Sequence, residues 1–172
     1  LEAGLPDSSS AVTINRFCSS GLQTIATISE RIMLGAIEVG VGGGVESMSM
    51  VPLGGNKAMF SPRVVAHRPE LYISMGITAE RVAAKYEIDR AAQDSFAYES
   101  HRRAVAAIAA GRFADEIVQV KTLEGDTFDT DEGPRADTTP EALAKLRPVF
   151  HVAGSVTAGN SSQTSDGAAM TV

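Results

Sequence analysis

The chain has 172 residues, 44% of them hydrophobic and 21% charged, and its mean hydropathy is +0.01. These values are typical of a globular domain large enough to fold without disulfides or a structural metal. The formal net charge of -6 argues against nucleic acid or an anionic membrane as partners, because such partners require clustered Lys and Arg.

The cysteine and histidine content bears on the cellular compartment and on metal binding. Cys18 is the single cysteine, so no internal disulfide can form, which suits the cytoplasm or an organelle matrix. The histidines His67, His101 and His151 are too scattered to predict a zinc site. No apolar stretch approaches the roughly 20 residues of a membrane span, and no segment resembles a signal peptide.

The residue pattern at the start of the chain predicts a strand, a tight turn and a helix. An apolar run over 11–14 predicts the strand, and apolar residues at three- and four-residue spacing predict a helix over about 19–34. Alternating apolar residues over 37–41 predict a buried strand that ends at the glycines 42–44. This order indicates a parallel α/β unit.

The rest of the chain predicts a long loop followed by helices. Residues 51–72 carry Pro and Gly without periodicity and predict a loop. Two helices follow, over 78–88 and from an N-cap at Asp89 to Gly111. The last predicted elements are a strand over 116–123, an acidic solvated loop without EF-hand spacing from 124, and a short helix over 139–146 with Pro140 at its first position.

The two ends of the chain indicate a piece of a longer polypeptide. The chain opens at Leu1 without a methionine, and its last residues, "SDGAAMTV", have the composition of a helix cut off near its start. We therefore expect further polypeptide beyond the 172 residues.

Cys18 stands where the predicted helix begins, and two interpretations of it are open. Unpaired cysteines are among the most buried residues, which favours an inert core thiol. Unpaired N–H groups and the positive end of a helix dipole instead favour a reactive thiolate, and the backbone N–H can stabilise charge on an attacked carbonyl. Gly21 would let a ligand approach the first turn. Position alone does not separate these interpretations.

Five segments, in order, carry a family resemblance: "NRFCSSGLQ", "GGGVESMSMVP", "SMGITAERVAAKY", "LRPVF" and "VTAGNSSQTSDGAA". They resemble the thiolase family of acetyl-CoA C-acyltransferases, most closely its degradative 3-ketoacyl-CoA branch. The resemblance implies an α/β fold, part of the N-terminal half of the thiolase fold, with a mixed sheet, helices on both faces and an inserted α/β loop domain. It assigns 1–50 and 152–172 to the core domain and 51–151 to the loop domain that covers the acyl-CoA pocket.

The resemblance also implies roles for individual residues. Cys18 matches the nucleophile that accepts the acyl group, and Met75 matches a methionine beside the acyl group and pantetheine. Arg135 matches a residue near the nucleotide end of coenzyme A. The segment along the pantetheine arm is matched by Ala158, Gly159 and Ser162. Without the resemblance, Met75 would be read as core, Arg135 as a surface charge and the Gly-Asn pair as a turn.

Other positions match the family without a role in chemistry, or depart from it. Glu46 and Ser47 match a motif with a structural role, and Ser74 replaces a histidine that many members have. The Gly-His-Pro motif, whose histidine activates the nucleophile, and the Cys-x-Gly-Gly-Gly motif, whose cysteine moves the substrate proton, do not occur in these residues. His67, His101 and His151 lie outside any such motif, so we expect them to be surface or loop residues and not bases.

The activity implied is thiolytic cleavage of a 3-ketoacyl-CoA, or the reverse condensation of acetyl-CoA, with coenzyme A and acyl-CoA as substrates and no metal or redox cofactor. We expect it to belong to a parent protein that forms a homodimer or homotetramer, with Ser47 to about Pro62 in the subunit contacts, and we expect this chain to be inactive alone. Two alternatives remain: a 3-ketoacyl synthase, a fold relative with a cysteine at a helix start, and a non-catalytic module in which Cys18 is inert or redox-sensing. Alkylation of Cys18 at neutral pH separates the enzymes from an inert thiol.

Overall fold

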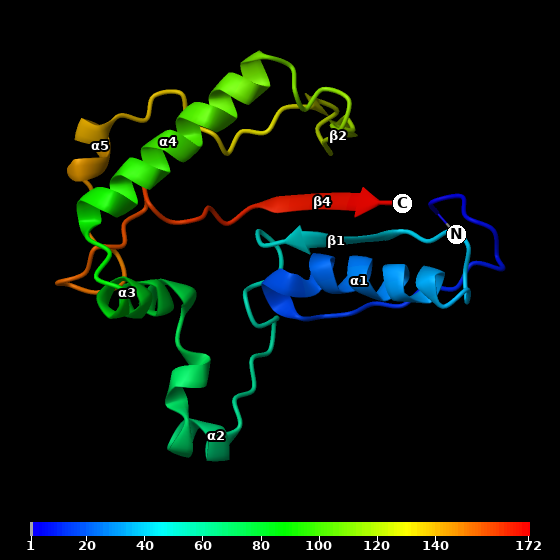
Figure 1. Cartoon of the computed structure of the whole chain (residues 1–172), viewed down its shortest axis with the longest axis horizontal. Helices are drawn as coiled ribbons and strands as arrows, with labels where there is room; N and C mark the ends of the chain where they lie inside the picture. Colours follow the sequence, from blue (N-terminus) through cyan, green and yellow to red (C-terminus); the bar gives the residue numbers. More distant parts are fainter. Residues whose placement is uncertain (1) are drawn as a thin grey trace. The chain divides into compact units, whose positions relative to one another are not determined.

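The computed structural model describes residues 2–172, which form two compact units (Figure 1). The first unit comprises the residues up to Ala58 together with Thr164–Val172, and the second comprises Met59–Gln163. Across residues 2–172, every helix is too short or too polar to cross a bilayer. Each unit combines helices with a small sheet, in agreement with the predicted α/β class.

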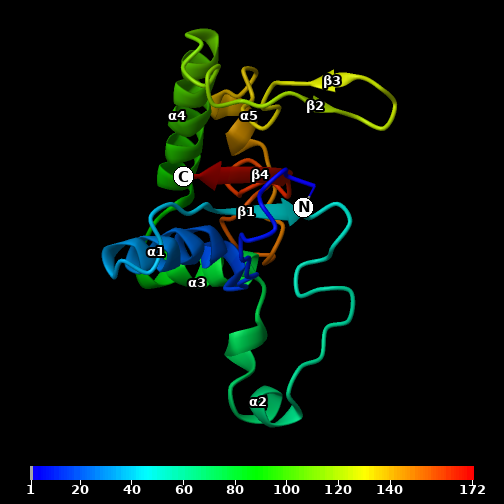
Figure 2. The same cartoon turned by 90° about the vertical axis from the view of Figure 1, so that its right-hand side faces the viewer.

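The first unit is a helix packed on a two-stranded ribbon (Figures 1 and 2). A 3-10 turn, η1 (Phe17–Ser19), leads directly into α1 (Ser20–Met33). Strand β1 (Gly42–Ser47) pairs antiparallel with β4 (Asp166–Thr171), with Gly42 opposite Thr171 and Ser47 opposite Asp166. The two strands come from segments more than 100 residues apart in the sequence.

Glycines in β1 allow this close packing. A Cβ atom at Gly42 would lie 3.2 Å from the backbone of Ile25 in α1, and one at Gly43 would lie 2.2 Å from the carbonyl oxygen of Ala169 in β4. The Thr24 hydroxyl of α1 donates a hydrogen bond of 2.9 Å to the Gly43 carbonyl. Gly42 and Gly43 therefore lie where a side chain would clash with α1 or β4.

Several predictions for the first unit are wrong. Residues 11–14 form no strand and are mostly exposed, since no other strand of the described chain lies beside them to complete a ladder. The strand predicted over 37–41 begins instead at Gly42, and its pairing is antiparallel. Residues 166–171 form β4 rather than a helix start, because pairing with β1 outweighs the helix propensity of their alanines. The helix predicted over 19–34 is confirmed.

The second unit is mainly helical, and its helix starts follow from local capping. The Ser74 hydroxyl accepts the N–H of Ile77, and the Asp89 carboxylate accepts the N–H of Ala92. Its elements are α2 (Pro62–His67), η2 (Pro69–Tyr72), α3 (Met75–Lys85), α4 (Arg90–Ala109), β2 (Val120–Lys121), β3 (Thr127–Phe128) and α5 (Pro140–Ala144).

The predicted helices of the second unit are confirmed, and α3 starts three residues earlier than expected because Ser74 caps it. The strand predicted over 116–123 shrinks to β2, which forms a short antiparallel hairpin with β3. The segment predicted as a loop over 51–72 contains α2 and η2. Proline at the first helical position starts both α2 and α5.

The core of the second unit lies where α4 and α5 meet the segment that follows α5. Leu143 and Val156 are its buried apolar residues, and Asp94 and Thr157 are its buried polar residues. Residues 152–163, which the resemblance assigned to the core domain, therefore pack here with the helices of the second unit. The pocket-covering role of 51–151 remains a prediction.

Candidate functional site

Cys18 lies in η1, one turn before the body of α1, and is exposed. It is therefore not a core residue of its unit. Its backbone N–H donates to no other described residue, whereas the next N–H, of Ser19, donates to the carbonyl of Arg16 at 3.2 Å. An exposed thiol beside an uncommitted N–H at a helix start is the arrangement that an acyl-accepting nucleophile with its own oxyanion contact requires.

Polar side chains on both sides of Cys18 fix the conformation of this turn. Phe17 has φ of 51°, in the left-handed region that non-glycine residues rarely adopt. The Asn15 side-chain oxygen accepts the Phe17 N–H at 2.9 Å. The Ser20 hydroxyl donates to the Phe17 carbonyl at 2.7 Å and accepts the Arg16 N–H at 2.8 Å. Sequence reasoning missed these roles, although Asn and Ser beside a helix start are typical backbone partners.

Met75, predicted to lie beside the acyl group, is the first residue of α3 and is 62% exposed. Ser74, which stands where many family members have histidine, is the N-cap of α3: its hydroxyl accepts the N–H of Ile77. A Cβ atom at Gly76 would lie 2.2 Å from the ring of Phe150, so the first turn of α3 rests directly on that ring. These contacts fix the turn that presents Met75 to solvent.

The structure brings Ala158, Gly159 and Ser162 together on one turn after α5. Ala158 and Ser162 are exposed, whereas Gly159 faces inward. A Cβ atom at Gly159 would lie 2.5 Å from Leu143 Cδ2 and 2.6 Å from Leu146 Cδ1. Gly159 therefore lets the turn sit close against α5, while Ala158 and Ser162 are left for a ligand.

Arg135 lies in the loop before α5 and is exposed. Its guanidinium donates to both carboxylate oxygens of Asp137, at 3.1 and 2.8 Å, and the backbone N–H of Arg135 donates to His101 Nδ1 at 3.0 Å. The hydrogen bonds to Asp137 raise the pKa of Arg135, and the same pair lowers the pKa of Asp137. A phosphate that approached Arg135 would share it with Asp137. No hydrogen bond within residues 2–172 joins Arg135 or Met75 to the 157–162 turn.

The histidines occupy the surface positions that the sequence predicts. His67 is in the last turn of α2, His151 lies in the exposed loop after α5, and His101 on α4 uses Nδ1 as an acceptor. In the part of the chain that the structure describes, no three His, Cys, Asp or Glu side chains are grouped so as to hold a metal ion.

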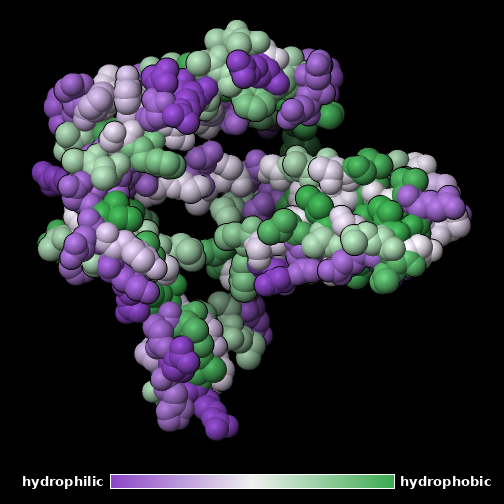
Figure 3. All heavy atoms as spheres, viewed as in Figure 1, coloured by the Kyte–Doolittle hydropathy of each residue, from purple (hydrophilic) through white to green (hydrophobic). Residues whose placement is uncertain are grey.

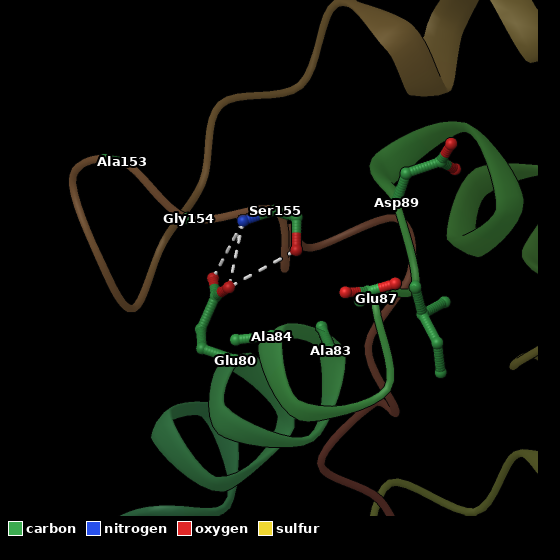
Figure 4. Close-up of a pocket in the computed structure, with 9 residues that line it drawn as sticks. Glu80, Ala83, Ala84, Glu87, Asp89, Ala153, Gly154 and Ser155 are labelled. Carbon is green, nitrogen blue, oxygen red and sulfur yellow. Dashed lines mark hydrogen bonds between the residues drawn. The ribbon is translucent and has the colours of Figure 1, made fainter.

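A shallow cavity of about 380 Å³ lies between the C-terminal half of α3 and residues 153–155 (Figure 4). Three carboxylates line it, those of Glu80, Glu87 and Asp89. The Glu80 carboxylate points to the loop and accepts the N–H of Ser155 (Figure 4). None of the predicted binding residues lines this cavity, and its carboxylates are unsuited to an anionic ligand such as coenzyme A.

Known proteins resemble this chain over its whole length. A family model described as "Thiolase, N-terminal domain" matches residues 1–172. The chain is 51% identical to the 3-ketoacyl-CoA thiolase of Bacillus subtilis, over 97% of this chain and 46% of that protein. It is 46% identical to the beta-ketothiolase BktB of Cupriavidus necator, over 100% of this chain and 48% of that protein.

A solved structure gives the same result. The dimeric peroxisomal thiolase of Saccharomyces cerevisiae superimposes with a TM-score of 0.90 at 41% identity, over 98% of this chain and 44% of that one. The chain thus spans less than half the length of the relatives that it matches.

Proposed function

The chain belongs to the thiolase family, as an N-terminal domain, and from this membership we propose that the full-length protein is an acyltransferase acting on 3-ketoacyl-CoA. The reaction is thiolytic cleavage by coenzyme A, or the reverse condensation of acetyl-CoA. The observation that carries the proposal is the exposed Cys18 with an uncommitted N–H at the start of α1, within a segment that matches thiolases throughout. Family membership favours this reaction over that of a 3-ketoacyl synthase.

In the cleavage direction, the Cys18 thiolate attacks the 3-keto carbon of the substrate. The bond between C2 and C3 breaks, its electron pair forms the enolate of acetyl-CoA, and protonation of that enolate completes the first product. The acyl group stays on Cys18 as a thioester. A second coenzyme A, its thiol deprotonated, attacks this thioester, the bond from the acyl carbon to Cys18 Sγ breaks, and acyl-CoA and the Cys18 thiolate are released. A thioester is exchanged for a thioester, so the route needs no metal and no redox cofactor.

Ligand binding is assigned to the second unit. Ala158 and Ser162 present an exposed turn to the pantetheine arm, Gly159 supports that turn, and Met75 lies beside the acyl group. Because the chain carries a net negative charge, the nucleotide phosphates need a local positive charge, and Arg135 supplies it. The relatives are about twice as long as the region that matches this chain. We assign the activating histidine and the proton-transferring cysteine to the corresponding remainder of the full-length protein.

The oligomeric state and the cellular compartment of the full-length protein are also proposed from its relatives. The yeast relative is described as dimeric and peroxisomal. We therefore expect a homodimer or homotetramer in the cytoplasm or an organelle matrix, with Ser47 to about Pro62 in the subunit contacts. Size-exclusion chromatography of the full-length protein tests the oligomeric state, and a monomer would contradict it.

The test of function compares Cys18→Ala and Cys18→Ser with Ser19→Ala in the full-length protein. Both Cys18 variants should lose roughly 1,000-fold or more of the thiolysis rate, because neither alanine nor an alcohol supplies a thiolate. Ser19→Ala changes the next residue of the same turn and should keep activity within about tenfold. Mass spectrometry after incubation with acetyl-CoA should place one acetyl group on Cys18. Full activity of Cys18→Ala would favour the non-catalytic alternative.

A further inference from the structure

The 157–162 turn is held from inside by one amide side chain. Asn160 Oδ1 accepts the N–H of Thr157 at 2.7 Å, which closes the turn locally. Asn160 Nδ2 donates to the Asp94 carboxylate at 3.0 Å and to the Ser155 carbonyl at 3.1 Å. The Asn160 amide thus links the start of the turn, at Ser155 and Thr157, to Asp94 on α4, and it uses both of its hydrogen-bonding atoms to do so.

The partner on α4 is itself fixed. Asp94 is 8% exposed, and its second carboxylate oxygen accepts Arg90 Nε at 2.7 Å. Arg90 also donates to the carbonyls of Leu143 and Leu146, at 2.6 and 3.0 Å, and so ties α4 to α5. A buried carboxylate with two charge-assisted or amide donors is a rigid anchor, because moving it would leave a charge unpaired.

Only an amide satisfies this position. The site requires one acceptor for the Thr157 N–H and donors for both Asp94 and the Ser155 carbonyl, and Asn supplies these on a short side chain. An aspartate would place a second carboxylate about 3 Å from Asp94. An aliphatic residue would remove the side-chain partner of the Thr157 N–H and of one Asp94 oxygen. The residues on the outer side of the same turn, Ala158 and Ser162, are exposed.

We propose that Asn160 is the positioning residue of the 157–162 turn, with Asp94 as its anchor, and that the pair sets the affinity for coenzyme A by fixing how Ala158 and Ser162 are presented. The inference rests on the proposed function, because the ligand is the one assigned there. Asn160 acts through the turn and not on the reacting atoms. Its loss should therefore weaken binding equally in the ground and transition states.

The experiment uses the full-length protein with Asn160→Asp, Asp94→Asn and the double variant. Asn160→Asp should raise the KM for coenzyme A at least about tenfold, because it removes both hydrogen bonds that Asn160 Nδ2 donates, one of them to a carboxylate, and it should leave kcat within about twofold. In the double variant, the amide introduced at position 94 can donate to the carboxylate introduced at position 160 and still accept from Arg90, so KM should recover at least part of the way. Recovery by exchange of the two side chains is a result that general damage to the fold would not give.

Glu99→Gln is the matched control. Glu99 is also a carboxylate on α4 that pairs with arginines, Arg102 and Arg103, and it makes no hydrogen bond to the 155–162 segment. Its KM should stay at the wild-type value. If Asn160→Asp does not fold, Asp94→Asn decides, since it keeps the volume of Asp94 and one of its two hydrogen bonds, and a KM raised at least threefold with unchanged kcat would support the proposal.

Calorimetric titration with coenzyme A distinguishes a failure of the positioning role of Asn160 from a failure of the proposed acyltransferase function. An unchanged affinity in Asn160→Asp and Asp94→Asn, with the wild type binding normally, would overturn the positioning role alone. Failure of the wild type to bind coenzyme A would overturn the positioning role and the proposed function together. A fall in kcat at unchanged KM would also contradict a role in ligand presentation.

Discussion

The Glu80 carboxylate accepts the backbone N–H of Ser155 with both oxygens, each at 3.0 Å, although the two residues are 75 positions apart in the sequence. It also accepts the N–H of Val156 at 2.9 Å. Desolvation of the carboxylate acts to raise its pKa, but these hydrogen bonds outweigh it, so the pKa of Glu80 lies below its ordinary value of 4.5. One side chain of α3 thus holds the segment that leads into the candidate ligand turn.

Glu80→Gln should lower the free energy of unfolding at pH 7 by about 1–3 kcal/mol, because two backbone N–H groups lose a charged acceptor. The Glu87→Gln variant is the control. Glu87 lines the same cavity, is exposed and makes no hydrogen bond to the loop, so its effect should stay within about 0.5 kcal/mol. Urea unfolding of the two variants and the wild type gives the comparison.

The effect of Glu80 should depend on pH in a defined direction. Because folding lowers the pKa of Glu80, the ionised carboxylate stabilises the fold above its unfolded value near 4.5, and that stabilisation is lost as the pH falls through the lower folded pKa. The stability curves of wild type and Glu80→Gln should therefore converge in acid. A difference that stayed constant down to about pH 2 would show that the carboxylate charge is not responsible.

Gly43→Ala should destabilise the first unit by about 3 kcal/mol, near the upper end of overpacking effects. The new Cβ atom would lie 2.2 Å from the Ala169 carbonyl oxygen and 2.8 Å from Met170 Cα, and backbone atoms of a paired strand cannot move aside cheaply. Gly44→Ala is the control, since its nearest neighbour is at 4.0 Å. Equal melting temperatures of the two variants would contradict the close approach of β1 and β4.

The helices of this chain could be predicted because their signals are local. Asp89 caps α4 and Pro140 begins α5, and each signal acts within a few residues. Strands β1 and β4 could not be predicted, because β1 exists through pairing with β4, more than 100 residues away, and glycine composition argues against a strand when read locally. The same reason explains why 166–171 has the composition of a helix yet forms a strand.

The candidate site was predictable in part. The resemblance predicts Cys18 and the 157–162 turn as site residues, and these roles remain predictions, but the residues that hold them in place are not visible in it. Asn15 and Ser20 act through backbone groups of Phe17 and Arg16, and Asn160 acts through Asp94 on another element. Such roles depend on a backbone conformation or on a distant partner, and neither is visible in residue spacing.

Gly21→Ala should separate stability from activity. The position is helical, within the first turn of α1, and a Cβ atom there meets nothing within 4 Å, so alanine should stabilise the fold by up to about 0.5–1 kcal/mol. If substrate approaches Cys18 over this turn, the added methyl should lower kcat/KM for 3-ketoacyl-CoA about tenfold or more. A variant that melts higher and keeps full activity would place the substrate elsewhere.

Arg135→Ala should raise the KM for coenzyme A about fivefold and leave kcat nearly unchanged, because it removes a charge that binds the ground and transition states equally. Asp137→Ala is the informative partner variant. It frees the guanidinium that now binds both Asp137 oxygens, and KM should therefore stay the same or fall. Both residues are exposed, so neither change should alter the melting temperature noticeably. A fall in kcat at constant KM in Arg135→Ala would contradict nucleotide binding.

Residues 1–172 expressed alone should show no steady thiolysis and should self-associate. Large apolar side chains of α1 and its continuation are open to solvent, with Leu22, Met33 and Leu34 exposed by 73, 85 and 83%, and Figure 3 shows hydrophobic residues on this surface. Exposed apolar surface of this extent normally promotes association. Light scattering should therefore report oligomers or aggregates, and mass spectrometry after acetyl-CoA treatment should find at most slow acetylation, confined to Cys18. Steady turnover by this chain would mean that a base and a proton donor lie among its own residues, and the assignment of those roles to the remainder of the full-length protein would be wrong.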